Sequence, residues 1–247
     1  QTSLSLAAIG GALCNDAKLI DIGDERYHTL GDPTEGAMVV AAAKMGYWKS
    51  SLDSSFPRAA ELPFDSERKR MTTVHHLERY DPAVLAGLEV GARRYIAFTK
   101  GSVDGLLGVT THVWVDGKAK LMDAGWRSKI EASNERLAKK GMRVLGVGYV
   151  KDPPDTYPES QEEFLIEYLG LVAFIDPPKP NIREVFSQFE EAGIQVKIIT
   201  GDNAVTTAAI AKQIGFHGDR RTMDGEELLR LEEPAFSEAV RRTDIFT

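Results

Sequence analysis

The sequence has almost no cysteine, no long hydrophobic run and no excess of basic charge, and each shortage excludes a class of protein. Its 247 residues include one cysteine, Cys14, so the chain can form no internal disulfide and no metal site built on several cysteines. The longest apolar runs, such as residues 38–43, fall far below the roughly 18 residues that span a membrane. Lys and Arg number 30 against 37 Asp and Glu, and the net charge of −7 argues against nucleic acid as a partner.

What remains is ordinary globular composition, with 43% hydrophobic and 27% charged residues. None of the histidines has the spacing of a metal site, and His75 and His76 point to opposite faces of a predicted strand. The chain begins at Gln1, and residues 4–13 are typical of a helix rather than of a signal peptide. We therefore expect a fragment of a longer protein with one or two domains.

Prolines at positions 177, 178 and 180 predict a stiff joint between two domains, residues 1–176 and 177–247. Before the joint, strands are predicted at residues 71–75, 95–99, 113–115, 143–150 and 169–175, with a hairpin turn at Asp116-Gly117. Helices are predicted at residues 32–45, where Asp32 is the N-cap and Glu35 completes a capping box, and at residues 124–140. This pattern favours an α+β domain with an antiparallel sheet flanked by helices.

After the joint, Ile182, Val185, Phe186 and Phe189 form a helical stripe. An apolar strand at residues 196–199, expected to be covered on both faces, leads through Thr200, Gly201 and Asp202 into a helix at residues 204–214. Helix, strand, glycine turn and helix together predict part of a doubly wound, Rossmann-like α/β domain.

Thr200, Gly201 and Asp202 lie where ligands bind in such sheets, and they fit either a phosphate and magnesium site or a capped turn. Lys100 beside Gly101 can reach a phosphate or can be a solvated lysine in a turn.

Three further candidates lie in the first part of the chain. Phe64 near Lys69 can stack on a purine, or it can be a core or edge aromatic. Glu35 can accept a hydrogen bond from adenine if its capping role leaves one oxygen free. Arg143 can contact a phosphate or ribose, or pair with an acid.

The order of these motifs is more specific than any one of them. Gly31-Asp32-Pro33-Thr34-Glu35, Phe64 with Lys69 and Met71, Phe98-Thr99-Lys100-Gly101, Gly141-Met142-Arg143, Asp176-Pro177-Pro178 and Thr200-Gly201-Asp202-Asn203 follow one another along nearly the whole chain. This series resembles the cytoplasmic part of a P-type cation-transporting ATPase, with the calcium-pump-like group as the nearest subtype.

The resemblance implies a nucleotide-binding domain followed by part of a phosphorylation domain with a haloacid-dehalogenase-like fold. ATP and Mg²⁺ are then the implied ligands, and the rest of a membrane pump is the implied partner, with this portion facing the cytoplasm. The implied nucleotide-binding residues are Glu35, Phe64, Ser66, Lys69, Met71, Lys100, Gly101, Arg143 and Asp176, and the implied phosphoryl site holds Thr200, Gly201 and Asp202.

The chain also departs from the family pattern. It lacks the phosphorylated Asp-Lys-Thr-Gly-Thr run and the later Gly-Asp-Gly-x-Asn-Asp motif, which we expect before Gln1 and after Thr247. Ser66 stands where many calcium pumps carry an arginine, and the missing central strand is expected to leave residues 196–199 as an exposed edge. The alternatives are a soluble haloacid-dehalogenase-type phosphatase and a non-enzymatic nucleotide-binding module.

Overall fold

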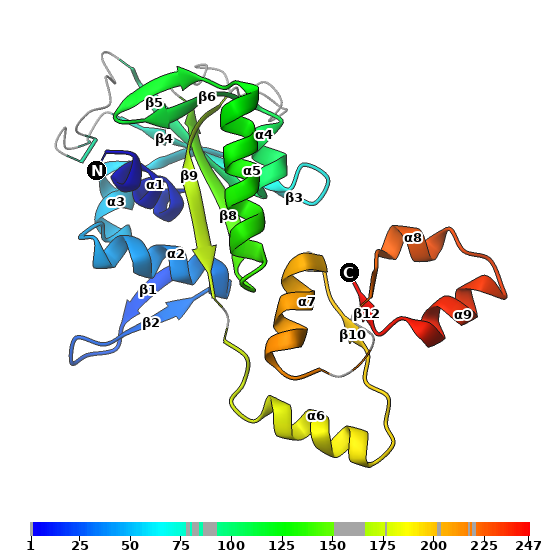
Figure 1. The fold of residues 1–247 in the computed structure, drawn as a ribbon. Helices are drawn as coiled ribbons and strands as arrows, with labels where there is room; N and C mark the ends of the chain where they lie inside the picture. Colours follow the sequence, from blue (N-terminus) through cyan, green and yellow to red (C-terminus); the bar gives the residue numbers. More distant parts are fainter. Residues whose placement is uncertain are drawn as a thin grey trace. The chain divides into compact units, whose positions relative to one another are not determined.

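The computed structural model describes residues 2–77, 80, 84–85, 93–150, 166–175, 177–201, 204–216, 218 and 221–247 (Figure 1). Contacts divide the chain into a first unit, residues 1–131 and 144–172, and a second unit, residues 132–143 and 173–247. Within the described ranges, no helix combines the length and the apolar character needed to cross a bilayer.

The first unit is built on a seven-stranded sheet with the strand order β3-β4-β5-β8-β9-β6-β7. Its strands are β3 (Arg58–Asp65), β4 (Arg70–His76), β5 (Tyr95–Gly101), β6 (Thr110–Val115), β7 (Lys118–Leu121), β8 (Arg143–Val150) and β9 (Ile166–Phe174). Neighbouring strands from β3 to β8 pair antiparallel, as do β6 and β7, but β6 and β9 are parallel. The sheet is therefore mixed rather than purely antiparallel, because the long connection from β6 to β9 through β7, α5 and β8 permits a parallel pair.

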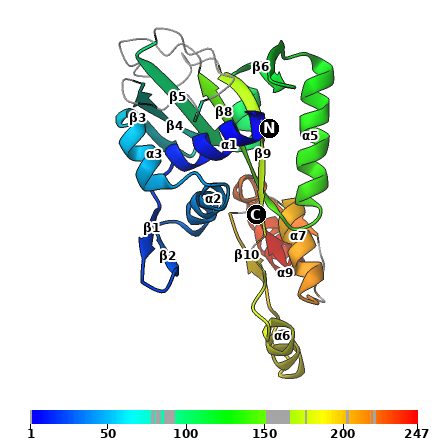
Figure 2. The ribbon, with the colours of Figure 1, turned by 90° about the vertical axis from the view of Figure 1, so that its left-hand side faces the viewer.

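Helices cover both faces of this sheet (Figures 1 and 2). One face carries α1 (Thr2–Leu13), α2 (Pro33–Lys44) and α3 (Lys49–Ser55), and the other carries α4 (Val103–Leu107) and α5 (Ala124–Ala138). Phe98 of β5 is fully buried toward α1, where a methyl group on Gly10 would collide with its ring. On the other face, Val74 and Ala97 pack with Leu106 and Ile130.

Local sequence signals account for several of these boundaries. Asp32 is the N-cap of α2, and its Oδ1 accepts hydrogen bonds from the backbone N–H groups of Thr34 at 2.8 Å and Glu35 at 3.1 Å. Asp116 and Gly117 join β6 to β7 with positive φ angles of 51° and 78°, as a tight hairpin turn requires. A separate hairpin of β1 (Lys18–Asp21) and β2 (Tyr27–Leu30) was not predicted from the sequence.

The second unit contains a three-stranded parallel sheet in the order β10-β12-β11. Its elements are α6 (Ile182–Glu191), β10 (Ile198–Ile199), α7 (Ala204–Gln213), β11 (Thr222–Met223), α8 (Gly225–Leu229), α9 (Ala235–Arg242) and β12 (Ile245–Phe246). The prediction of a strand over residues 196–199 covered on both faces is wrong in two respects. The strand covers only Ile198–Ile199, and Ile199 is 81% exposed because β10 lies at the edge of the sheet, as the expectation of an exposed edge implied.

Candidate functional site

A β-bulge determines which way Phe64 faces. The β3–β4 register shifts by one residue between Leu62 and Asp65, so that Pro63 and Phe64 together stand opposite Met71. The shift moves Phe64 off the face that carries Leu62 and onto the face that carries Met71. The Phe64 ring remains 64% exposed, so one of its sides is free to meet a flat ligand.

Lys100 lies on the same face of the sheet as Phe64, on the next strand but one. It pairs with Met71 in the β4–β5 register, so Phe64, Met71 and Lys100 lie across neighbouring strands on one face of the sheet. Lys100 is only 6% exposed, which is unusual for a lysine unless an anion accompanies it.

The partner of Lys100 is Glu35, in the first turn of α2. The Lys100 ammonium donates to Glu35 Oε1, and Glu35 Oε2 accepts from the backbone N–H of Asp16 at 3.2 Å. The capping-box prediction for Glu35 is therefore wrong, because its carboxylate lies against Lys100 and Asp16 while Asp32 alone provides the side-chain cap. Each Glu35 oxygen has one partner, and each retains a lone pair for another donor.

The turn after β3 adds a second lysine. Lys69 adopts a left-handed backbone with φ of 53°, is 59% exposed in its side chain, and has its Nζ 3.8 Å from Asp104 Oδ2. Ser66 is exposed in the same turn. Gly101 at the end of β5 lies so close to this turn that a methyl group there would collide with the main chain of Lys69, which explains the glycine.

Backbone N–H groups in this turn also stabilise a charge. Asp65 Oδ1 accepts from the N–H groups of Arg68 and Glu67, both at 2.9 Å. These hydrogen bonds, led by that from Arg68, hold the pKa of Asp65 below its usual value.

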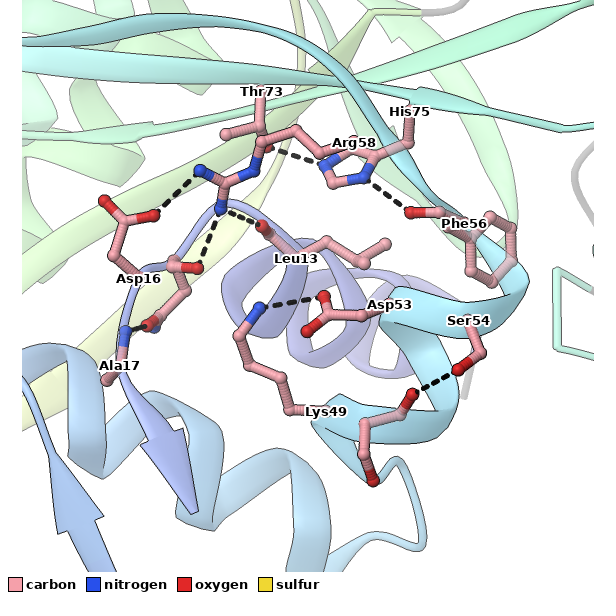
Figure 3. Close-up of polar contacts among 12 residues, drawn as sticks. Leu13, Asp16, Ala17, Lys49, Asp53, Ser54, Phe56, Arg58, Thr73 and His75 are labelled. Carbon is pink, nitrogen blue, oxygen red and sulfur yellow. Dashed lines mark hydrogen bonds and ion pairs between the residues drawn. The ribbon is translucent and has the colours of Figure 1, made fainter. Parts of the chain in front are cut away.

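Figure 3 shows a cluster of polar contacts that includes His75 and Arg58. His75 Nδ1 lies 2.9 Å from the Phe56 carbonyl oxygen, which can only accept, so Nδ1 carries the proton and Nε2 accepts from Thr73 Oγ1 at 2.8 Å. Burial disfavours the charged ring and lowers the pKa of His75 to about 4. Burial likewise raises the pKa of the Cys14 thiol, whose Sγ lies 3.6 Å from the Met71 carbonyl oxygen.

Arg58 lies in the same cluster and contacts two carboxylates and two main-chain carbonyl groups (Figure 3). Its guanidinium donates to Asp16 Oδ1 and Glu61 Oε2, each at 2.8 Å, and to the carbonyl oxygens of Asn15 at 2.9 Å and Leu13 at 3.3 Å. Desolvation lowers the pKa of Arg58, but the hydrogen bonds and charges of Asp16 and Glu61 outweigh it and raise the pKa overall. No local pattern predicts this cluster, because its members come from distant segments.

The remaining predicted residues lie in the second unit or outside the described residues. Arg143 is exposed at the start of β8. Thr200 follows β10 and donates its backbone N–H to Phe246 O at 3.0 Å, and Gly201 is exposed beside it. Asp176, Asp202 and Asn203 lie outside the described residues.

Comparison with known families decides how this arrangement is interpreted. Residues 4–181 match the family described as P-type ATPase, cytoplasmic domain N. The chain belongs to this family. The resemblance drawn from the order of motifs is thereby confirmed, and the match includes the whole seven-stranded sheet of the N domain.

Individual relatives agree with the family match. The calcium-transporting ATPase of Bacillus subtilis is 35% identical over 238 residues, which cover 96% of this chain and 25% of that protein. The probable cation-transporting ATPase F of Mycobacterium bovis is 34% identical over 254 residues, which cover 100% of this chain and 26% of that protein. The calcium-transporting ATPase 1 of Lactococcus lactis is 34% identical over 238 residues, which cover 95% of this chain and 25% of that protein. The chain thus spans about a quarter of the length of these curated relatives, which are named as ATPases rather than as phosphatases.

Proposed function

We propose that this N domain binds ATP on behalf of a cation-transporting P-type ATPase. The observation that carries the proposal is the exposed Phe64 ring on the same sheet face as the buried Lys100–Glu35 ion pair. An aromatic surface beside a fixed cation suits a ligand that combines a flat base with negative charge.

Each residue then has a role that follows from its chemistry. Phe64 stacks on the adenine, Met71 supports it from the sheet, and Lys69 and Lys100 compensate the phosphate charge. Glu35 lies near the base and holds Lys100, and it can accept from the adenine amino group through a remaining lone pair. Ser66 can donate its hydroxyl, and Gly101 lets the turn that carries Lys69 pack closely on the end of β5.

We further propose that residues 177–247 form part of a haloacid-dehalogenase-like phosphorylation domain, with Asp176 at the hinge between the domains. Thr200, Gly201 and Asp202 would contact the transferred phosphoryl group, and Arg143 would contact ribose or phosphate. The parallel sheet with Thr200 at the carboxyl end of β10 supports this proposal.

The intact protein would use ATP with Mg²⁺ to form an aspartyl phosphate and move a cation across a membrane, with this portion in the cytoplasm. Among the residues that the structure describes, no three His, Cys, Asp or Glu side chains lie together as a metal site. What these residues do is bind and orient the nucleotide, which suits phosphoryl transfer because positioning and charge neutralisation dominate its catalysis.

Substitution of Phe64→Ala tests the site directly. We expect about tenfold weaker ATP binding in a calorimetric titration, since stacking on one base contributes about 1–3 kcal/mol. The free energy of unfolding should change by less than about 0.5 kcal/mol, because the ring is exposed.

Phe189→Ala is the matched control, because Phe189 is another partly exposed phenylalanine, in α6 of the second unit. It should leave ATP affinity unchanged. Equal affinity of wild type and Phe64→Ala would refute the proposed site.

A further inference from the structure

Asn15 is a fully buried asparagine whose side chain joins three segments of the first unit. Its Nδ2 donates to the carbonyl oxygens of Gly11 in α1 at 3.1 Å and of Glu35 in α2 at 3.0 Å. Its Oδ1 accepts from the backbone N–H of Ala17, just before β1, at 2.8 Å. Both ends of the amide are thus satisfied, and the geometry fixes which atom is oxygen and which is nitrogen.

These bonds bear directly on the Glu35–Lys100 pair. Asn15 holds the main chain of Glu35, and the next residue, Asp16, donates its backbone N–H to Glu35 Oε2. The same short segment therefore fixes Glu35 at its carbonyl and at its carboxylate. Arg58 in turn holds the segment from outside through the carbonyl oxygens of Leu13 and Asn15 (Figure 3).

The position of the Lys100 ammonium depends on this support. Lysine has a flexible stem and a point charge, so its place in a site is set by its partner rather than by its own shape. Here the partner is Glu35, and Lys100 and Glu35 side chains are only 7% and 18% exposed. A displaced Glu35 would leave a poorly solvated ammonium without a fixed anion.

We propose that Asn15 is a positioning residue of the nucleotide site, acting through Glu35 to hold the Lys100 ammonium where the ligand charge meets it. The inference rests on the proposed ATP binding, although the placement of Lys100 is measurable without nucleotide. Asn15 touches no ligand itself, and its effect passes through the Glu35–Lys100 pair.

The test uses Asn15→Asp, which keeps the size of the side chain and the acceptor for Ala17. When ionised, the new side chain donates neither hydrogen bond of Asn15, and when protonated it donates at most one. ATP binding, followed by NMR titration, should weaken about fivefold, the change that corresponds to one neutral hydrogen bond. In a Lys100→Met background, the same substitution should change affinity less than about twofold, because the residue it positions is gone. Equal weakening in both backgrounds would overturn the proposal.

A second measurement needs no nucleotide, so it tests the role of Asn15 even if the protein does not bind ATP. The protein is prepared with ¹⁵N at the Nζ atom of its lysines, and the Lys100 NMR signal is assigned by its loss in Lys100→Met. This signal should move or broaden in Asn15→Asp. Thr110→Val is the control, since it removes a partly buried hydrogen bond elsewhere in the first unit, from Thr110 Oγ1 to Leu106 O at 2.8 Å. It should leave the Lys100 signal and the affinity unchanged.

The outcomes separate the two proposals. A shifted Lys100 signal without any wild-type ATP binding would refute the proposed function while keeping Asn15 as the support of Lys100. An unchanged Lys100 signal in a folded Asn15 variant would refute the positioning role. If Asn15→Asp does not fold, Asn15→Ala is measured in the same way and judged by the same criteria.

Discussion

The two units of this chain differ in how much of each element is buried. In the first, α1 buries Leu6, Ile9 and Leu13 almost completely against the rest of the unit. In the second, neither α6 nor α9 has a buried residue, although both are amphipathic. Helix burial in the second unit comes from α7, where Ala211 is fully buried, so its two-residue strands cover less helical surface than the seven-stranded sheet does.

The largest effect should come from removing a central side chain of the first unit. Phe98→Ala should lower the free energy of unfolding by about 3–5 kcal/mol, because it empties a fully buried site next to Gly10. Urea denaturation followed by circular dichroism measures the loss.

Phe216→Ala makes the same change in the second unit, where Phe216 packs edge-to-face on Phe186 with ring centroids 5.8 Å apart. We expect a smaller loss, because this smaller core can collapse around the gap. A loss of unfolding free energy as large as that of Phe98→Ala would contradict the expected difference between the two units.

Acid should weaken the first unit through His75. Its folded pKa of about 4 lies below the usual 6.5, so the unfolded chain binds a proton first as the pH falls. Stability is complete above pH 6.5 and declines toward pH 4, by at most about 3 kcal/mol for the whole shift.

NMR titration of the His75 ring, together with unfolding at several pH values, checks this prediction. His75→Gln should flatten the decline between pH 6.5 and 4. A His75 pKa near 6.5 in the folded protein would contradict the buried, neutral ring.

The smallest effect should come from the exposed edge of the second unit. Ile199→Thr keeps a β-branched side chain at a position that is 81% exposed, so the free energy of unfolding should change by less than about 0.5 kcal/mol. Thermal unfolding measures it, and Ile245→Thr, at a fully buried position of the neighbouring strand, provides the contrast. A large loss from Ile199→Thr would mean that another chain covers this edge.

Prediction from sequence succeeded where the determining residues are close together. The cap of α2 by Asp32 and the hairpin at Asp116-Gly117 both depend on neighbours along the chain. The capping-box alternative for Glu35 was wrong, because the capping-box spacing is local while its partner Lys100 is 65 residues away. Asn15 gave one weak signal, a polar residue directly after an apolar helix.

The sequence was enough to establish the order of motifs that identifies the family, the helices at residues 32–45 and 124–140 and the hairpin turn at Asp116-Gly117, but it did not predict β3. These follow from side-chain chemistry repeated at short spacing. The tertiary structure was needed to show that β6 and β9 run in parallel, that a bulge puts Phe64 on the sheet face of Met71 and Lys100, and that Asn15 hydrogen-bonds the main chain of Glu35. Such contacts join segments far apart in the chain, and their energies exist only once the sheet and its helices have packed.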